Sequence, residues 1–211
     1  MSDTRARERI TVYSDYVCPF CYLGRLSLDQ YQAERDERLE IDWRPFDLRA
    51  EKRGPDGEID HSVDDGKGDD YYEQARENVR RLREQYDAEM AQEIATDVDS
   101  RPAQVVSLHV KETEPYDTWL AFDEAVFEAL WVDGRDIGDP DVLVDCAGAA
   151  GLDASVVDAA LDDETLDARI GDRFDAARRE GVTGVPTFAY GGHAARGAVP
   201  PSQLRRLVEG S

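Results

Sequence analysis

Strand signals are confined to the two ends of this chain of 211 residues, and its long middle shows only helical patterns. Residues 10–14 and 39–45 alternate apolar and polar side chains, as half-buried strands do. Residues 186–190 and 193–199 flank Gly191-Gly192, a pair that favours a two-residue hairpin turn. No strand signal occurs between residues 50 and 180. We therefore expect one small sheet, assembled from both ends of the chain, with a helical insertion between them.

The order of these elements predicts an α/β fold. The helix that follows residues 10–14 is expected to run to about Glu37, which is long enough to connect two parallel strands in a β-α-β unit. At the other end, a helix, the hairpin and a short helix at 202–209 that begins after Pro200-Pro201 give the order α-β-β-α. The predicted plan is thus β-α-β, a large all-helical insertion, and then α-β-β-α.

We divide the chain accordingly. Residues 1–9 are expected to form a charged leader, residues 10–49 and 181–211 the sheet domain, and residues 50–180 the helical insertion. Residues 51–70 are rich in Gly and Asp and predict a solvated loop. Apolar residues at spacings of three and four predict a long helix from Tyr71 to about Ile94 and further helices near 102–112, 118–131, 140–149 and 154–161. The last helix of the insertion, about 165–180, is expected to pack back on the sheet domain.

The charge of the chain excludes some partners. There are 47 acidic and 25 basic residues, a net charge of −22, and such a surface repels phosphate groups. We therefore expect no nucleic-acid partner and no membrane partner. Only three of the basic residues are lysines, and the acidic residues are spread along the whole chain. This pattern is typical of proteins in concentrated salt, where charges are screened within ~3 Å at 1 M, and predicts a halophilic source.

The chain has three cysteines, Cys18, Cys21 and Cys146. An odd number with one close pair does not predict a disulfide framework. The N-terminal residues are polar and charged where a signal peptide would be apolar, and no apolar run is long enough to span a membrane. We therefore expect a cytoplasmic protein, and in that reducing compartment a close cysteine pair is catalytic or metal-binding rather than structural.

The pair Cys18-Pro19-Phe20-Cys21 stands where the first strand ends and its helix begins. Unpaired N–H groups at a helix N-terminus favour the thiolate form of Cys18, which is the nucleophile in disulfide exchange. Cys21 is one turn further along the same face and can form a disulfide with Cys18. Two alternatives stay open, half of a zinc site and two inert buried cysteines, but a second pair of zinc ligands is missing. We predict no metal and no cofactor beyond a small thiol as a possible co-substrate.

The second motif is Gly184-Val185-Pro186-Thr187-Phe188. In the simpler interpretation, Pro186 only starts a strand after the preceding helix. In the functional interpretation, the Val185–Pro186 bond is cis and faces Cys18, so that the backbone of Val185 can hydrogen-bond an extended substrate chain.

These motifs together resemble a known family. The segments D-Y-V-C-P-F-C-Y-L-G at 15–24, G-V-P-T-F at 184–188 and R-G-A-V-P-P-S-Q-L at 196–204 are similar to the DsbA-like thioredoxin-fold oxidoreductases, and most similar to their cytoplasmic FrnE-type branch. The resemblance covers about residues 10–209. It implies a thioredoxin-like fold with an inserted helical domain, Cys18 as the nucleophile, Cys21 as the resolving thiol and Pro186 as the cis-proline.

The resemblance implies a thiol–disulfide oxidoreductase that forms a mixed disulfide on Cys18 with protein or low-molecular-weight thiol substrates. Periplasmic members carry His between the cysteines, where this chain has Pro19-Phe20. Without that cation we expect a weaker oxidant, so a reductase or isomerase role is as plausible as an oxidase role. The alternatives are a glutathione-dependent isomerase or kappa-type transferase, which usually carries Ser in place of Cys18, and a holdase that uses a groove of the helical domain.

Other residues near the cysteine pair have two interpretations. Tyr16, Phe20 and Tyr22 either form a lip for client chains or pack the insertion onto the sheet domain. His109 is expected to be a structural histidine and Cys146 a small core residue. The residues predicted to bind substrate are Pro19, Phe20, Val185, Pro186 and Tyr16.

Overall fold

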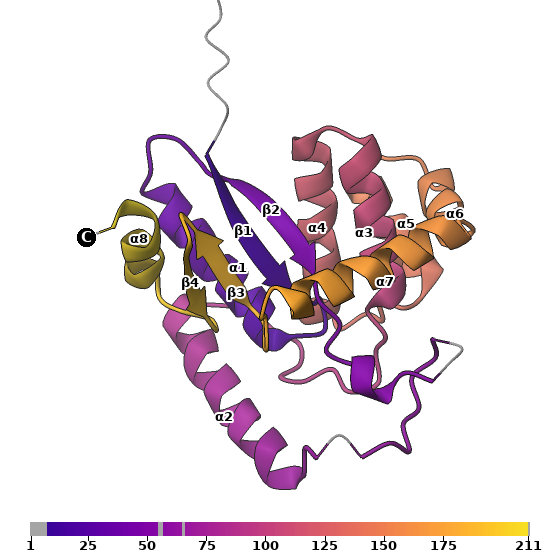
Figure 1. The fold of residues 1–211 in the computed structure, drawn as a ribbon, viewed down its shortest axis with the longest axis horizontal. Coiled ribbons are helices and arrows are strands. Elements are labelled where there is room, and N and C mark those ends of the chain that lie inside the picture. Colours follow the sequence, from indigo (N-terminus) through magenta and orange to yellow (C-terminus); the bar gives the residue numbers. More distant parts are fainter. Residues whose placement is uncertain (1–7, 55–56, 65, 211) are drawn as a thin grey trace, which may run out of the picture.

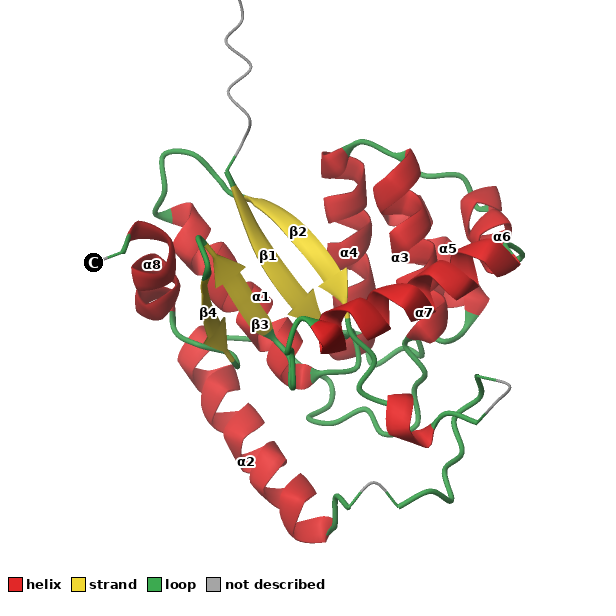
Figure 2. Ribbon diagram, in the orientation of Figure 1, coloured by secondary structure: helices red, strands yellow, loops and turns green. Residues whose placement is uncertain are grey.

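The sheet of the protein is formed by both ends of the chain, as expected. In the computed structural model, which describes residues 8–54, 57–64 and 66–210, the strands are β1 (Arg9–Ser14), β2 (Glu40–Pro45), β3 (Thr187–Tyr190) and β4 (His193–Arg196). Their order in the sheet is β2-β1-β3-β4 (Figures 1 and 2). Strands β1 and β2 are parallel, whereas β3 is antiparallel to both β1 and β4. Most of the predicted leader, residues 1–7, lies outside the described residues.

The helices follow the predicted order. Helix α1 connects the two parallel strands. Helices α2 to α7 belong to the described part of the insertion, and α8 is the last helix of the chain. Helix α7 contacts β2 as well as α3, so the last helix of the insertion lies against the sheet (Figure 1). The bounds are α1 (Pro19–Ala33), α2 (Asp69–Tyr86), α3 (Arg101–Thr113), α4 (Tyr116–Trp131), α5 (Pro140–Ala149), α6 (Ser155–Leu161), α7 (Glu164–Arg179) and α8 (Pro201–Glu209).

Three predicted boundaries were wrong. Helix α1 ends at Ala33 rather than near Glu37. Helix α2 ends at Tyr86, because Asp87 adopts a left-handed conformation with φ of 51°. The apolar residues beyond it, which suggested that the helix continues to residue 94, are instead packed in a loop, where Met90 is buried. Strand β4 ends at Arg196 rather than at residue 199, since Gly197 has a φ of 83°.

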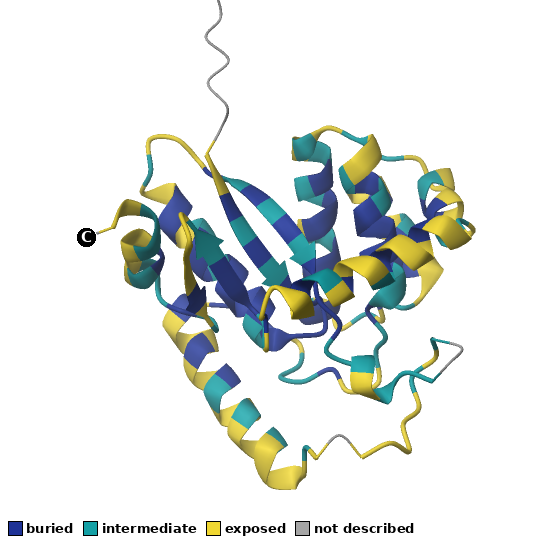
Figure 3. Cartoon of the chain, viewed as in Figure 1, coloured by how far each residue is buried: buried dark blue, intermediate teal, exposed yellow. Residues whose placement is uncertain are grey.

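The core joins the sheet domain to the insertion. The inward faces of β1 and β2 contribute Ile10 and Trp43, and β3 contributes Phe188, all of them buried. Trp119 and Trp131 of α4 belong to the same cluster of buried residues. Figure 3 shows buried positions both in the sheet and along α4. None of the described helices combines the length and the apolar character needed to cross a membrane.

Candidate active site

The two close cysteines lie at the N-terminal end of α1. Strand β1 ends at Ser14, and Cys18 occupies the position just before the first helical residue, Pro19. The Cys18 N–H donates to the carbonyl oxygen of Asp15 at 3.1 Å, and the Cys18 carbonyl accepts from the N–H of Cys21 at 2.9 Å. Proline fits the first helical turn because no hydrogen bond is required of its nitrogen there. The short segment after β1 therefore fixes Cys18 at the end of the helix and Cys21 one turn inside it.

The segment before β3 faces this helix end. The Val185–Pro186 peptide bond is cis, as the sequence predicts. The Cys18 thiol lies 3.5 Å from the carbonyl oxygen of Val185 and donates to it. Pro186 is buried against α1, where a Cβ added to Gly24 would lie only 3.0 Å from Pro186 Cγ. The missing side chain of Gly24 thus permits the close approach that brings the two motifs together.

The three thiols differ in surroundings rather than in exposure. All three are free and buried, with Cys18 at 3% and Cys21 at 2% exposed. Burial raises the pKa of Cys21 well above its ordinary value, and the adjacent Cys18 sulfur raises it further. Cys146 lies in α5, where its thiol donates to the carbonyl of Ala125 at 3.5 Å and burial raises its pKa to about 11. Cys146 is thus a small core residue, as predicted.

A pocket of about 310 Å³ adjoins Cys18 and does not include Cys21 in its wall. Three of the residues predicted to bind substrate, Pro19, Phe20 and Val185, line it. Pro186 does not line it. The remaining walls come from the segment after β2, the start of α2, the loop near residue 95 and the segment before Val185. These wall residues are Val17, Leu48, Arg49, Lys67, Tyr71, Tyr72, Ala75, Ile94, Ala95, Thr96, Thr183 and Gly184.

The assignment of Tyr16 to the substrate site is corrected by the structure. Tyr16 is 1% exposed, and its hydroxyl is hydrogen-bonded to Ser107 at 2.8 Å and to Asp123 at 2.9 Å. Its side chain packs the insertion onto the sheet domain, which was one of its two interpretations. Tyr22 is likewise buried and stacks on Trp131. Of the three flanking aromatic residues, only Phe20 reaches the pocket beside Cys18.

A buried carboxyl group supports the segment before Cys18. Asp15 is 1% exposed and accepts hydrogen bonds from Ser100 Oγ at 2.5 Å, Gln104 Nε2 at 3.2 Å and the Leu48 N–H at 2.9 Å. Burial raises the pKa of Asp15 to about 6, although these hydrogen bonds act in the opposite direction. This role of Asp15 could not be predicted from the sequence, because Leu48, Ser100 and Gln104 are 33 to 89 residues away.

This carboxyl predicts a pH-dependent stability. The pKa of Asp15 is about 6 in the folded state and ordinarily 3.8, so its contribution is favourable at low pH and is lost as pH rises through 6. The difference corresponds to roughly 3 kcal/mol. The free energy of unfolding should therefore fall less between pH 4.5 and pH 8 in Asp15→Asn than in the wild type. Urea denaturation at each pH measures this free energy. Equal losses in both proteins would contradict the assignment.

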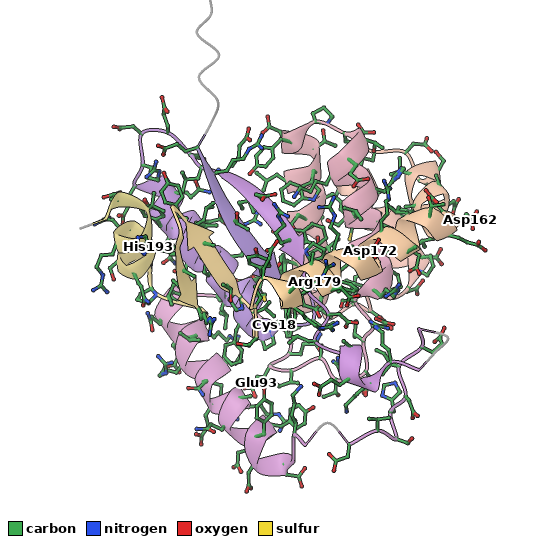
Figure 4. All side chains as sticks on the ribbon, in the orientation of Figure 1. Cys18, Glu93, Asp162, Asp172, Arg179 and His193 are labelled. Carbon is green, nitrogen blue, oxygen red and sulfur yellow. The ribbon has the colours of Figure 1, made fainter. Side chains whose placement is uncertain are left out.

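Other polar clusters do not reach the site. Among residues 8–54, 57–64 and 66–210, no group of three or more His, Cys, Asp or Glu side chains is arranged to hold a metal ion. Figure 4 shows His193 in the β3–β4 hairpin, away from Cys18. Besides Asp15, sequence reasoning missed Gly24, Arg49 and Lys67 among others, because their closeness to Cys18 or Pro186 follows only from the fold.

Comparison with known proteins finds relatives of similar sequence and similar fold. The uncharacterized protein YwbO of Bacillus subtilis (strain 168) is 28% identical over 201 residues, covering 94% of each chain. A probable DsbA oxidoreductase of Streptomyces coelicolor, SCO1869, has a similar fold, with a TM-score of 0.74, 22% identity, and coverage of 96% of this chain and 90% of that one. The cytosolic disulfide reductase DsbM of Pseudomonas aeruginosa, solved with GSH, gives a TM-score of 0.59, 20% identity, and coverage of 94% and 92%.

The family model of the DSBA-like thioredoxin domain matches residues 9–209, which include all four strands and both motifs. This chain therefore belongs to the DSBA-like thioredoxin domain family.

Proposed function

We propose that the protein is a thiol–disulfide oxidoreductase that acts through Cys18 and Cys21. The observation that carries this proposal is the position of the Cys18 sulfur, at the N-terminus of α1, in the wall of a pocket and 3.5 Å from the Val185 carbonyl. Cys21 lies one helical turn behind it. A nucleophilic thiol that faces a substrate pocket, backed by a second thiol, is the arrangement that disulfide exchange requires.

The exchange proceeds in two steps. The Cys18 thiolate attacks one sulfur of a substrate disulfide, forms a mixed disulfide and releases the other sulfur as a thiolate. Cys21 then loses its proton and attacks the Cys18 sulfur, which forms the Cys18–Cys21 disulfide and releases the second substrate thiolate. The protein dithiol is oxidised by two electrons and the substrate is reduced by two. The raised pKa of Cys21 keeps it protonated until that second step.

The backbone of Val185 is the proposed guide for the substrate. It belongs to the pocket wall, and its carbonyl oxygen already contacts the Cys18 sulfur. An extended segment beside Cys18 can therefore hydrogen-bond this backbone as a strand bonds an edge. Pro19 and Phe20 supply apolar contacts on the helix side of the same pocket.

The residues between the cysteines bear on the direction of electron flow. Pro19 and Phe20 carry no charge to stabilise the Cys18 thiolate, so we infer a weaker oxidant than the members with His at this place. A reductase or isomerase of the FrnE-type branch, acting in a reducing cytoplasm on protein or small thiol and disulfide substrates, fits this property best.

Competitive labelling tests the roles of the thiols. When the reduced protein is treated with a limiting thiol reagent at neutral pH, Cys18 should be modified first, because it alone among the three lines the pocket. Cys146 should be modified last, since it is buried in the insertion and its pKa is raised to about 11. Peptide mapping at early times gives the order. Faster labelling of Cys146 than of Cys18 would refute the assignment.

We also infer that the surface is adapted to concentrated salt. The net charge of −22 produces self-repulsion, which falls as the screening length shortens to ~3 Å at 1 M salt. Raising KCl from 0.1 M to 2 M should therefore raise the melting temperature, by about 2–4 °C for each kcal/mol gained. Sucrose, which stabilises proteins without screening charges, is the control. An unchanged melting temperature across the KCl series would remove this inference.

A further inference from the structure

The wall of the pocket beside Cys18 differs in charge from the rest of the protein. More than one residue in five of the chain is Asp or Glu, yet none of the described residues that line this pocket is acidic. Two of them, Arg49 and Lys67, are basic. A groove of about 630 Å³ between α1 and the end of α2 shows the opposite pattern. Its wall contains five carboxylates, those of Asp29, Asp87, Glu89, Glu128 and Asp133.

The positive charge of Arg49 is held in place but not neutralised. Its Nη1 donates to the carbonyl of Thr96 at 2.7 Å, and its Nη2 donates to the carbonyl of Ala95 at 2.5 Å. Within the part of the chain that the structure describes, no carboxylate forms an ion pair with this guanidinium. A guanidinium has five N–H donors, so donors remain for a ligand after these two bonds are made.

Two acidic residues that directly precede wall residues are paired with arginines outside the wall. Asp47 is bound to Arg53 Nε at 2.7 Å, in a pair with both side chains buried. Glu93, which precedes the wall residue Ile94, is bound to Arg80 Nε at 2.7 Å. The charges of these two carboxylates are therefore matched by Arg53 and Arg80, and neither residue lines the pocket. Lys67 adds a second cation, with Nζ 5.9 Å from the centre of the Tyr71 ring.

We propose that this pocket selects low-molecular-weight thiols and disulfides that carry carboxylate groups, and that Arg49 binds the carboxylate. The proposal rests on the proposed function and names its substrate class. A volume of about 310 Å³ suits a small molecule, and an arginine fork matches the two oxygens of a carboxylate. The apolar wall residues, Phe20 and Tyr72 among them, accommodate the carbon chain that joins the carboxylate to its sulfur.

The overall charge of the protein makes the opposite prediction, which allows a sharp test. A net charge of −22 attracts cations and repels anions at long range, so the global field alone favours a cationic disulfide.

The test uses three symmetrical disulfides: anionic 3,3′-dithiodipropionate, neutral bis(2-hydroxyethyl) disulfide and cationic cystamine. Each is reduced to two thiols while Cys18 and Cys21 form their disulfide. The rate constant for each is divided by its rate constant with free 2-mercaptoethanol, which removes differences in intrinsic reactivity.

We expect the anionic disulfide to react about tenfold faster than the neutral one, as a charge-assisted hydrogen bond allows, and the cationic one to be slowest. In Arg49→Gln the ratio of the anionic to the neutral rate constant should fall to near one. The matched control is Arg206→Gln, which removes the same charge from an exposed residue of α8 that does not line the pocket and should keep the wild-type ratio.

Three outcomes overturn the proposal: the cationic disulfide reacting fastest with the wild type, equal rate constants for all three, or the same ratio in Arg49→Gln and Arg206→Gln. Because Arg49 also holds two carbonyl groups, Lys67→Gln is measured as a second variant and should lower the ratio in part. If the three disulfides react with equal rate constants, the substrate preference is wrong but the proposed oxidoreductase function is not contradicted. If none of the three disulfides oxidises the Cys18–Cys21 pair, the proposed function itself fails.

Discussion

Replacing Cys18 with serine is expected to reduce thiol–disulfide exchange to the uncatalysed rate, because a serine hydroxyl cannot form the mixed disulfide. Replacing Cys21 with serine should leave the first step intact and remove the second. Mixed disulfides on Cys18 should therefore accumulate in Cys21→Ser and be visible by mass spectrometry. The two variants together separate the nucleophile from the resolving thiol.

The control for this pair is Cys146→Ser. Cys146 lies in α5 and outside the pocket, so this variant should retain exchange activity. Mixed disulfides found on Cys146, or exchange that persists in Cys18→Ser, would contradict the assignment of the nucleophile.

Replacing Asp123 with alanine is expected to destabilise the protein by about 3 kcal/mol, because it removes the buried carboxylate that pairs with Arg25 and leaves only the partly exposed Asp29 and Glu124. Asp123 is 1% exposed and accepts from Arg25 Nη1 at 2.6 Å and from the Tyr16 hydroxyl at 2.9 Å. Arg25 belongs to α1 and Asp123 to α4, so the pair joins the helix of the cysteine motif to the insertion.

The same arginine provides a matched control. Glu124 accepts from Arg25 Nη2 at 3.2 Å, but its side chain is 48% exposed. Exposed ion pairs contribute about 0–1 kcal/mol, so Glu124→Ala should have a small effect. Urea denaturation of both variants measures the difference. A loss in Asp123→Ala no larger than that in Glu124→Ala would show that the buried pair does not hold the two parts together.

The sequence predicts those features whose signals are local. The alternation in residues 10–14 and 39–45 identified β1 and β2, and Gly191-Gly192 identified the β3–β4 hairpin. These patterns are readable because each strand shows one face to the core. The end of α2 was missed, since apolar residues beyond Tyr86 continue the helical spacing although they pack in a loop. Periodicity alone does not distinguish these two cases.

Only those site residues that stand in local sequence motifs could be predicted. Cys18, Cys21 and Pro186 stand in short motifs, and their positions could be predicted from the sequence. The hydroxyl of Tyr16 bonds to residues 91 and 107 positions away, so no local pattern indicates that its side chain is buried against α3 and α4. Arg49 reaches the pocket through contacts with carbonyls 46 and 47 residues away. Such contacts depend on tertiary structure and leave no local pattern.

The most direct measurement of the central claim is a redox titration of the wild-type protein in glutathione buffers of graded potential, with dithiothreitol buffers for the most reducing points and the cysteine-containing peptides mapped at each point. We expect one two-electron transition that forms the Cys18–Cys21 disulfide, with a tenfold change in the ratio of oxidised to reduced protein for about 30 mV. Its midpoint should lie between about −300 mV, typical of structural disulfides, and about −120 mV, the value of a strong oxidant of this family. If Cys18 and Cys21 remain thiols across this range, or if the disulfide that forms includes Cys146, the protein does not exchange electrons through this pair.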